Sequence, residues 1–321
     1  MASRQPKSDT VVFLNPKTCG LYKKGLTKYR VDPTSGQRTE TVDDELNEHV
    51  EAYLKGVLPP GASRRSLKEV QKAQVIVPTY YDPRYLQPFR ALCEAHALTA
   101  VSIGELLDEG TLQLFGGHGS PGNDQRVGTV PYIKVSDLRA LRVNINPTNR
   151  VPLELARKFW GNEHSGLSAW DLISPNRASS NIGEFALLLP GEEEVLITKE
   201  VFILRIAGGT KQGWSPFYLL WALSLTEVRN QWRRVTLMQT NREDVGQRYR
   251  EILLPRPSSP DWAASVSGPF RDYFSTVAES RTRFSSNITE LSARGFTFIP
   301  SVRQATTAAA LAALEEAPEA D

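Results

Sequence analysis

The sequence predicts an α+β fold, with a small twisted β-sheet and supporting helices, a β-rich segment before them and one long helix after them. Short β-branched or aromatic runs bounded by Pro, Gly, Asn and Ser are typical of strands separated by turns, and they recur within residues 130–135, 185–189 and 201–206. Two later stretches place apolar residues three, four or seven apart, the spacing that buries one face of a helix. The sheet is therefore expected in the middle of the chain.

The first expected element is an N-terminal β-rich segment over residues 1–78, with one or two short helices. Thr41 with Asp44, and Ser66 with Glu69, have the spacing of capping boxes, which satisfy the free N–H groups of a helix's first turn. In order, the segment is predicted to contain a disordered polar start at 1–10, a strand at 11–15 and a hairpin at 20–37. A first helix is predicted from Thr41 through about Leu54, and a second, short helix after Ser66.

The helical stretches follow residue 215. Pro216 suits a first helical turn, where its missing N–H leaves no bond unmade. From there one helix is predicted through residue 232, with a buried stripe of Phe217, Leu220, Trp221, Leu225, Val228 and Trp232. The proline-rich stretch 253–260 cannot continue a sheet and ends the central domain, expected over 79–257. A seven-residue apolar repeat then predicts a helix of about 25 residues within 258–297, and residues 298–321 are expected to be a disordered tail.

The composition limits the kind of protein. With 40% hydrophobic and 23% charged residues, the 321-residue chain has the make-up of a soluble globular protein. Its net charge is only +2, so a surface for nucleic acid has to be a local basic patch on a nearly neutral body.

Cysteine and histidine usage predicts neither a metal nor a redox site. Cys19 and Cys93 lie far apart, which suits two reduced thiols in the cytoplasm, and no two of the four histidines fall within one helical turn. No apolar run approaches the roughly 20 residues that span a bilayer. The start of the sequence also lacks the apolar core of a signal peptide. We therefore expect a cytoplasmic protein without a membrane segment.

Residues 174–181, with the sequence SPNRASSN, form a polar loop between two predicted strands. Asn and Arg side chains offer the paired donors and acceptors that base edges require, so the composition suits a loop that reads nucleic acid. On composition alone, an ordinary solvated hairpin loop is the alternative.

The ordered succession of these pieces resembles a target recognition domain, the DNA-reading module of the specificity subunits of type I restriction-modification systems. The same module is fused to some adenine-N6 DNA methyltransferases. The pieces that carry the resemblance are TYYDPRYLQPF (79–89), VSIGELLDEGTLQLFGG (101–117), GTVPYIKVSDL (128–138), WDLISPNRASSNIGEFALLLP (170–190), ITKEVFILRI (197–206) and RYREILLPRP (248–257). Residues 1–78 are similar to the segment that follows the catalytic core of the fused enzymes, with a small subdomain that pads the recognition domain as the alternative.

A glycine-rich stretch at 115–125 fits F-x-G-x-G, the pattern that lets a methyltransferase backbone pass beneath S-adenosylmethionine. That chemistry also needs a helix directly after the loop, whereas Ser120, Pro121 and Gly122 break the chain, and no Asn/Asp-Pro-Pro-aromatic motif occurs. We therefore expect no cofactor here, and interpret the stretch as a flexible loop at the entrance of the recognition domain.

The resemblance implies a subunit without catalytic activity, which binds double-stranded DNA and directs a separate adenine-N6 DNA methyltransferase in restriction-modification or phage defence. Two alternatives remain: a divergent DNA methyltransferase or nuclease, and an assembly protein that bridges components of a defence complex. Specificity subunits usually carry two recognition domains, whereas this chain has room for one. It resembles half a subunit, which pairs with itself to form a homodimer or serves one methyltransferase alone.

The resemblance and the loop compositions together give two sets of candidate residues. The candidate DNA contacts are Tyr132, Lys134, Asn144, Asn146, Arg150, Asn176, Arg177, Ser179, Ser180, Asn181, Lys211, Gln212 and Arg242. The candidate contacts for partner docking, which follow the seven-residue stripe of the last helix, are Phe270, Tyr273, Phe274, Val277, Phe284, Ile288 and Leu291.

Overall fold

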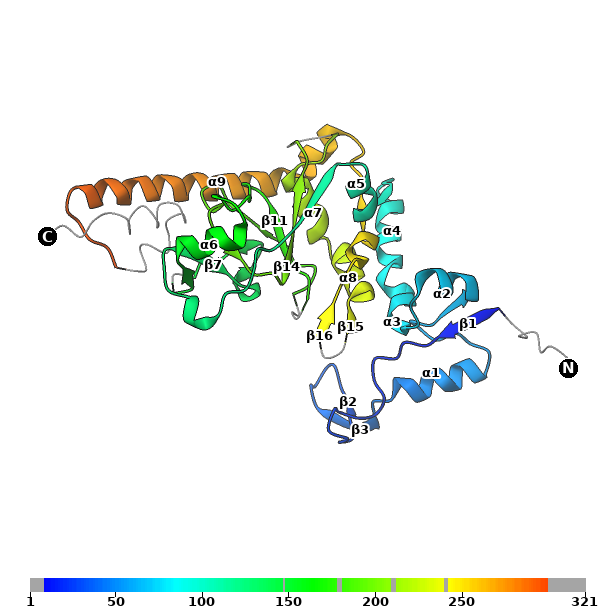
Figure 1. Ribbon diagram of the computed structural model, residues 1–321. Coiled ribbons are helices and arrows are strands. Elements are labelled where there is room, and N and C mark those ends of the chain that lie inside the picture. The colour runs from blue at the N-terminus through cyan, green and yellow to red at the C-terminus, as the bar shows by residue number, and fades with distance from the viewer. Residues whose placement is uncertain (1–8, 147, 178–180, 209–211, 240–241, 300–321) are drawn as a thin grey trace, which may run out of the picture. The chain divides into compact units, whose positions relative to one another are not determined.

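The computed structural model in Figure 1 describes residues 9–146, 148–177, 181–208, 212–239 and 242–299. The chain divides into two compact units, unit 1 (Met1–Leu92) and unit 2 (Cys93–Asp321). Both combine helices with small sheets, and unit 2 includes a long helix, so the predicted α+β fold is confirmed. The domain boundaries expected at residues 78, 257 and 297 stay predictions.

Unit 1 is built on two antiparallel strand pairs. In its small core the ring of Phe13 stacks on Tyr81, with centroids 4.2 Å apart. Ser66 and Glu69 form the predicted capping box, whereas the first helix is capped by Asp44 instead of Thr41. The elements are β1 (Thr10–Phe13) paired with β4 (Ser63–Ser66), β2 (Tyr29–Val31) paired with β3 (Arg38–Val42), α1 (Glu45–Leu54), α2 (Leu67–Ala73), α3 (Pro78–Tyr81) and α4 (Gln87–Ala95), whose last residues belong to unit 2.

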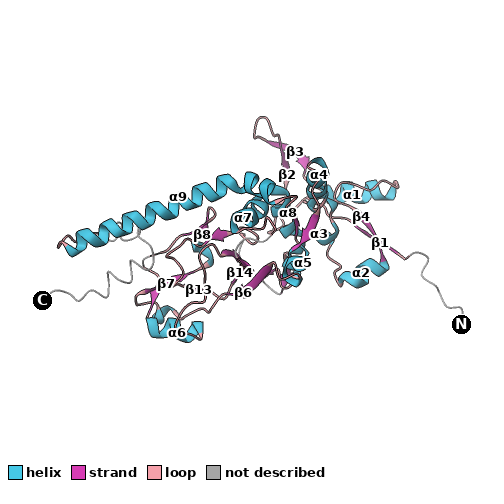
Figure 2. Cartoon of the chain, turned by 90° about the horizontal axis from the view of Figure 1, so that it is seen from above, coloured by secondary structure: helices cyan, strands magenta, loops and turns pink. Residues whose placement is uncertain are grey.

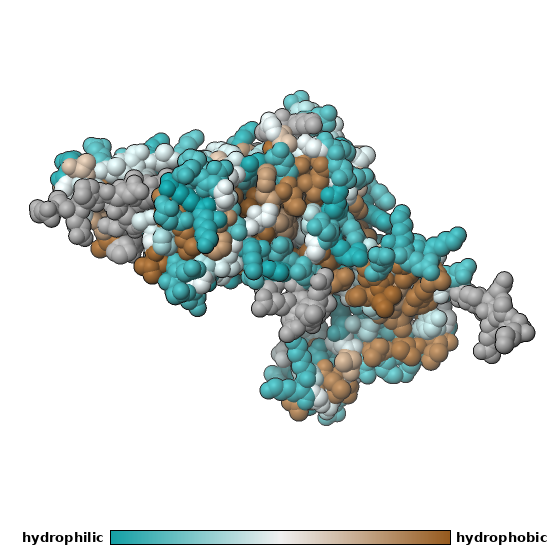
Figure 3. All heavy atoms as spheres, in the orientation of Figure 1, coloured by the Kyte–Doolittle hydropathy of each residue, from teal (hydrophilic) through white to brown (hydrophobic). Residues whose placement is uncertain are grey.

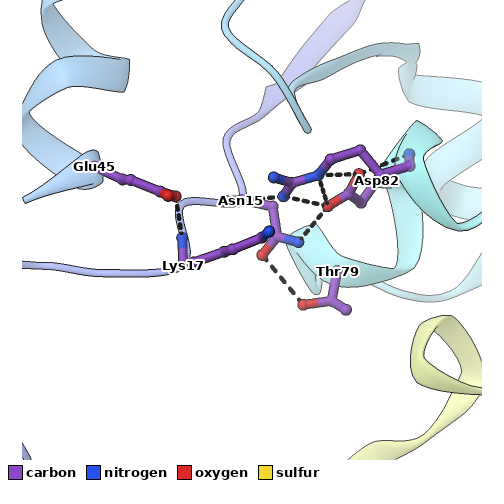
Figure 4. Close-up of polar contacts among 6 residues, drawn as sticks. Asn15, Lys17, Glu45, Thr79 and Asp82 are labelled. Atoms are coloured by element: carbon purple, nitrogen blue, oxygen red, sulfur yellow. Dashed lines mark hydrogen bonds and ion pairs between the residues drawn. The ribbon is translucent and has the colours of Figure 1, made fainter. Parts of the chain in front are cut away.

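A buried carboxylate, Asp82, holds segments of unit 1 together (Figure 4). The side-chain amide of Asn15 donates to it over 2.7 Å, and the guanidinium of Arg84 pairs with it at 2.6 Å. Burial alone would raise the pKa of Asp82, but these hydrogen bonds outweigh it and hold the pKa below its usual value. The hydroxyl of Thr79 donates in turn to Asn15 over 3.2 Å, so a polar network supplements the small apolar core.

Unit 2 contains the predicted sheet, with β11 and β14 at its buried centre. These strands run antiparallel, with Pro175 opposite Val201 and Leu172 opposite Leu204, and all four residues of β11 are buried. The strand order is β6 (Leu112–Gly116), β14 (Val201–Ile206), β11 (Leu172–Pro175), β12 (Ala186–Leu187), β9 (Arg142–Val143) and β8 (Leu138–Arg139).

A smaller sheet shares the same core. Ile133 and Ile197 of this sheet pack with Ile173 and Ile203 of the larger one. Its strand order is β10 (Arg150–Val151), β7 (Val130–Ile133) and β13 (Leu196–Ile197). The other elements of this part of unit 2 are β5 (Ala100–Ser102) paired with β17 (Leu253–Pro255), β15 (Leu237–Gln239) paired with β16 (Arg242–Asp244), α5 (Ile103–Asp108) and α6 (Leu153–Trp160).

The helix predicted from residue 216 to residue 232 is in fact two helices, α7 (Pro216–Ser224) and α8 (Thr226–Val235). Leu225 between them has extended backbone, with ψ 134°. The hydroxyl of Ser224 donates to the carbonyl four residues earlier over 2.6 Å, a local bond that competes with the helical ladder. A single extended residue leaves the apolar spacing almost unchanged, so the sequence pattern could not reveal the break.

The predicted long helix is α9 (Pro260–Ala293), one continuous helix capped by Ser259 (Figure 2). Near its start Trp262 packs edge-on against Trp221, with ring centroids 5.7 Å apart. Further along, Arg281 forms an ion pair with the fully buried Glu192. The rest of unit 2 therefore contacts α9 at two places. Within the described ranges no helix is both long and apolar enough to cross a membrane. Apart from its first two residues, the tail predicted at 298–321 lies outside those ranges.

Candidate nucleic-acid interface

Two polar residues, Asn176 and Arg177, directly follow the buried strand β11, and both are half-buried. The backbone of Asn176 is held from two sides: its N–H donates to the carbonyl of Glu200 over 3.0 Å, and its carbonyl accepts the N–H of Val245 over 3.1 Å. Arg177 forms an antiparallel bridge with Asp244 on β16. The beginning of the predicted base-reading loop is therefore fixed by backbone pairing.

Two lysines lie at neighbouring strand ends. Lys134 follows β7, and the exposed Lys199 lies between β13 and β14. Because β7 and β13 run parallel, and the N–H of Thr198 donates to the carbonyl of Ile133 over 2.9 Å, both lysines follow the same end of this strand pair. The residue after Lys199 is the one that binds the backbone of Asn176.

Asn144 joins these residues through Asp137. The carboxylate of Asp137 accepts the N–H of Lys134 over 2.8 Å, and its carbonyl accepts the N–H of the exposed Asn144 over 2.8 Å. Burial raises the pKa of Asp137, and the N–H of Lys134 partly opposes this. We use the name strand-end site for Lys134, Asn144, Asn176, Arg177 and Lys199.

The strand-end site contains two buried polar atoms without a partner among the described residues. They are the side-chain oxygen of Asn176 and the Nε of Arg177. A buried polar atom that makes no hydrogen bond costs about 1–3 kcal/mol, so two on adjacent residues call for an explanation such as a ligand or an ordered water. Asn and Arg are also the side chains that make paired contacts with the edges of adenine and guanine.

The segment around Lys134 and Asn144 is strongly basic. Residues 126–158 contain seven Lys or Arg and two Asp or Glu, a net charge of +5 in a chain whose total is +2. Arg139 and Lys158 within this segment are exposed. The exposed basic residues of this segment can supply the local basic patch that a nearly neutral chain needs in order to bind DNA.

Two of the predicted DNA contacts, Tyr132 and Arg150, face the interior. Tyr132 is 2% exposed and packs with Val151 in the core of the smaller sheet. Arg150 is 7% exposed, and its guanidinium donates to the carbonyl of Thr129 over 3.3 Å. Both side chains support the sheet, so we leave them out of the strand-end site, and DNA contact by either stays a prediction.

Asn146 and Gln212 also lie apart from the strand-end site. The side-chain oxygen of Asn146 accepts the N–H and the hydroxyl of Thr148 over 3.0 and 2.8 Å, a local turn that occupies this group. Gln212 is exposed and follows the end of β14 that is opposite to Lys199. A six-residue strand is roughly 20 Å long, so Gln212 belongs to another part of unit 2.

The remaining predicted DNA contacts belong to the same loop and to the adjoining hairpin. Asn181 is half-buried, and its carbonyl accepts the N–H of Glu184 over 2.9 Å. Arg242 lies on β16, two residues before the Asp244 that bridges to Arg177. The three other predicted residues lie outside the described ranges: Ser179, Ser180 and Lys211.

Two glycines in the first half of the glycine-rich stretch at 115–125 pack closely against other residues of unit 2. Residues 122–125 are exposed, so the flexible loop expected there stays a prediction. A Cβ on Gly117 would lie 1.9 Å from the carbonyl oxygen of Thr198, and one on Gly119 would lie 2.1 Å from the ring of Phe159. Both glycines therefore serve close packing, since any side chain there would collide with these neighbours.

His118, between these two glycines, anchors the stretch. Its Nδ1 accepts the N–H of Ile197 over 3.1 Å, so its Nε2–H is left to donate to the carbonyl of Ser165 over 2.9 Å. Burial lowers the pKa of His118, and the ring is neutral at neutral pH.

The candidate docking residues on α9 divide into three groups. Phe274 and Ile288 are buried, at 1% and 5% exposure, while Tyr273 and Phe284 are 53% and 38% exposed. The half-buried members of the stripe are Phe270, Val277 and Leu291. The fold of the chain itself therefore covers part of the seven-residue stripe, and Tyr273 and Phe284 stay the best placed for contact with a partner.

One residue of the strand-end site, Lys199, was not predicted. It follows the apolar run Leu196–Ile197, and a charged residue at a strand end is too common to indicate a site. Only the parallel pairing of β13 with β7, which cannot be read from local sequence, brings it into line with Lys134.

No group of three or more His, Cys, Asp or Glu in the described ranges is placed to hold a metal ion. A pocket of about 200 Å³ opens beside the β8–β9 turn, with Leu141, Phe185 and Leu223 in its lining. Its lining also includes Arg229 and Glu184, whose charged groups lie 3.5 Å apart. The pocket is mainly apolar and carries a paired charge.

No protein-family model matches this sequence, and neither does any curated protein. Among solved structures, the chain is similar to the S subunit of a type I restriction-modification system from M. genitalium, with 10% identity and a TM-score of 0.36 over 61% of this chain and 42% of that one. It is also similar to the HsdS subunit from Thermoanaerobacter tengcongensis, with 14% identity and a TM-score of 0.35 over 80% of this chain and 58% of that one.

A third similar structure is the type IIG restriction endonuclease BpuSI, with 11% identity and a TM-score of 0.42 over 68% of this chain and 33% of that one. The aligned region thus spans 33% to 58% of these three structures. They include the kind of specificity subunit that the sequence resembles. What these proteins bind or assemble with is a property of those proteins.

Proposed function

We propose that this chain is a DNA sequence-specificity subunit, which binds duplex DNA through the strand-end site and directs a separate adenine-N6 DNA methyltransferase in restriction-modification or phage defence. The observation that carries the proposal is the convergence of Lys134, Lys199, Asn176 and Arg177 at the ends of buried strands, tied together by backbone hydrogen bonds. Loops fixed on a packed core can hold reading side chains in one geometry, as sequence recognition requires.

The two kinds of side chain at the strand-end site have different tasks. Lys134 and Lys199 are suited to phosphates, whose contacts position a protein on the duplex without reading its sequence. Arg177 and Asn176 are suited to base edges: an Arg side chain pairs with O6 and N7 of guanine, and an Asn side chain with N6 and N7 of adenine.

The methyltransferase partner would supply both the cofactor and the chemistry, because the target adenine has to leave the stack to reach an active site. An assembly protein that no longer binds DNA is the alternative function. The +5 charge of residues 126–158 favours DNA binding over this alternative, since nothing in a purely protein-bridging role requires a concentrated basic segment.

Selection from a randomised duplex library with the full chain tests the DNA-reading part. We expect a defined recognition sequence and an affinity that falls steeply between about 50 and 200 mM salt, as counterion release predicts for several phosphate contacts. Adding the recovered duplex to the chain and an adenine-N6 methyltransferase should direct methylation to that sequence. Binding without sequence preference, or no binding at low salt, would refute the proposal.

A further inference from the structure

The pocket of about 200 Å³ beside the β8–β9 turn is walled by three irregular stretches of backbone. The first is the turn itself, residues 140–141, and the second is the end of α7 at Ser224, directly before the break between α7 and α8. The third is the stretch before β12, where Gly183 has φ 83° and packs against the ring of Trp232. We call this cavity the turn pocket.

The turn is held in a conformation that its residues do not favour. Ala140 and Leu141 have φ of 49° and 65°, the left-handed region that two-residue hairpin turns normally leave to Asn and Gly. The carbonyl of Leu141 accepts the N–H of Leu187 on β12 over 2.9 Å, which fixes the turn against the sheet. Backbone strain of this kind persists only where the surrounding structure imposes it, and it clusters at ligand sites. The fold therefore maintains this wall of the pocket in spite of its cost.

The turn pocket lies at the same end of the larger sheet as Asn176 and Arg177. Because β11 and β12 run antiparallel, the start of β12 lies beside the end of β11, which these two residues follow. The strand β9 runs parallel to β12, so the turn before β9 is at this end as well. The hydroxyl of Ser174 on β11 also accepts the N–H of Gly183 over 3.3 Å. The pocket is therefore a neighbour of the predicted base-reading residues.

The interior of the turn pocket is mainly apolar. Its buried wall residues include Leu138, Phe185 and Leu223. An apolar cavity of roughly 150 Å³ holds one benzene ring, so the turn pocket has room for one flat ring system.

Two of the three charged side chains that line the pocket neutralise each other. The guanidinium of Arg229 lies 3.5 Å from one carboxylate oxygen of Glu184 and so holds that carboxylate in place. The side chain of Glu184 is 54% exposed, and its second oxygen has no partner among the described residues. This oxygen can accept a hydrogen bond from an N–H group of a ligand.

The third charged side chain, Arg139, gives the lining its net positive charge. Its Nε donates to the carbonyl of Ser136 over 3.1 Å, and within the described ranges no carboxylate forms an ion pair with its exposed guanidinium. The carboxylate of the nearby Asp137 accepts the N–H of Lys134. Arg139 also belongs to the basic segment 126–158, and Figure 3 shows a largely hydrophilic surface over α6 in that segment. A guanidinium in this setting suits a phosphate group.

We infer that the turn pocket binds a nucleotide, with the base against its apolar walls, an amino group of the base on Glu184 and the phosphate on Arg139. Adenine, cytosine and guanine carry an exocyclic amino group, whereas thymine does not. The nucleotide is either a free mononucleotide or one that has swung out of a duplex. The second source rests on the proposed function, and the first does not.

Titration of the full chain with mononucleotides in a calorimeter tests the pocket itself. The affinity for dCMP should be about tenfold higher than for TMP, because a hydrogen bond to a charged group is gained. Glu184→Ala should remove this preference. Arg139→Gln should weaken dCMP binding about tenfold and leave the binding of deoxycytidine, which has no phosphate, unchanged. Arg233→Gln is the matched control, since Arg233 is an exposed arginine of α8 that does not line the pocket.

Duplexes that carry 2-aminopurine, whose fluorescence rises when it leaves the base stack, test the second source. The analogue is placed in turn at each position of the recovered recognition sequence, with no methyltransferase present. An extruded nucleotide should brighten at one position with the wild-type chain and stay dark with Ser224→Phe, which fills the mouth of the pocket. If Ser224→Phe does not fold, Arg139→Gln replaces it and should reduce the signal, because it changes only an exposed side chain.

The two measurements separate the possible results. Mononucleotide binding that Arg139→Gln weakens, without brightening of any duplex, identifies a free nucleotide as the ligand, whereas brightening identifies an extruded one. The inference is overturned if neither signal appears at millimolar nucleotide, or if Arg139→Gln and Glu184→Ala both leave dCMP binding unchanged. A chain that binds its duplex with sequence preference but gives neither signal loses the pocket assignment and keeps the proposed function. A chain that binds mononucleotides but no duplex does the reverse.

Discussion

The guanidinium of Arg281 on α9 pairs with the carboxylate of Glu192, a residue 89 positions earlier whose side chain is wholly buried. Burial raises the pKa of Glu192, and the charge of Arg281 acts against this rise. Removing two charges from water is costly, and their mutual attraction offsets this cost. Loss of either member would leave the other charge buried without its partner. The attachment of the long helix to unit 2 therefore depends on an intact ion pair as well as on apolar packing.

Loss of one partner should destabilise the chain more than loss of both. Arg281→Ala leaves an unpaired buried carboxylate and should lower the free energy of unfolding by roughly 3–5 kcal/mol. The double substitution Glu192→Gln with Arg281→Met should recover much of this loss. Urea titrations of these variants measure the difference, and Arg283→Ala, at an exposed position of the same helix, should stay within about 0.5 kcal/mol of the wild type. Equal effects of the single and the double change would contradict the coupling.

The same pair predicts a pH dependence. Because folding raises the pKa of Glu192 above its ordinary value of 4.5, the folded chain holds this proton more tightly than the unfolded chain. The contribution of Glu192 to stability therefore falls as the pH rises above that value. Glu192→Gln lacks this contribution, so its melting temperature relative to the wild type should improve from about pH 4 to about pH 7. A constant difference across this range would argue against a buried, charged Glu192.

His118 should make the fold sensitive to acid. Its pKa is lowered by burial, so the unfolded chain takes up a proton more readily, and stability falls as the pH drops through the ordinary value of 6.5. The His118→Gln variant should lose less stability than the wild type between about pH 7.5 and pH 5.5. At the higher pH the variant should be less stable than the wild type, because the substitution disturbs the ring's two hydrogen bonds. An unchanged slope in His118→Gln would contradict this account.

Two neighbouring glycines offer a matched test of the close packing. Gly119→Ala places a Cβ 2.1 Å from the Phe159 ring and should cost about 1–3 kcal/mol of stability, the usual range for overpacking. Gly116→Ala places its Cβ in open space, with no atom within 4 Å, and should have little effect. Thermal unfolding followed by circular dichroism measures both variants. The packing argument fails if the two behave alike.

On the proposed function, the two kinds of DNA contact should respond differently to substitution. Arg177→Ala should weaken binding to the recognised sequence by about 1–3 kcal/mol and relax the preference at one base position, since it removes a paired base contact. Lys199→Ala should weaken binding to all sequences and reduce the salt slope by about one, because it removes a phosphate contact. Fluorescence anisotropy at several salt concentrations distinguishes these effects, with Arg283→Ala as the control. A uniform loss from Arg177→Ala would reassign it to the phosphates.

The sequence predicted elements whose signal is local. The capping box of Ser66 and Glu69 and the seven-residue apolar repeat of α9 depend on residues close in sequence, and the structure confirms both helices. At 34 residues, α9 is longer than the helix of about 25 residues that the repeat predicted. The sequence could not predict features that depend on tertiary packing. Tyr132 looks like an exposed aromatic in a polar neighbourhood, but the core of the smaller sheet and helix α6 cover it. Lys199 follows the same strand end as Lys134 only because β13 pairs in parallel with β7.

On the proposed function, the strand β11 has a consequence for how such a chain changes its target. All four of its residues, from Leu172 to Pro175, are buried in the core, and the first two lie between two paired strands, whereas Asn176 follows the end of the strand. A new preference for bases can thus arise by exchanging the amino acids at the tip, without repacking the interior. On this arrangement, the packed strand and the base-reading residues that follow it can change independently of each other.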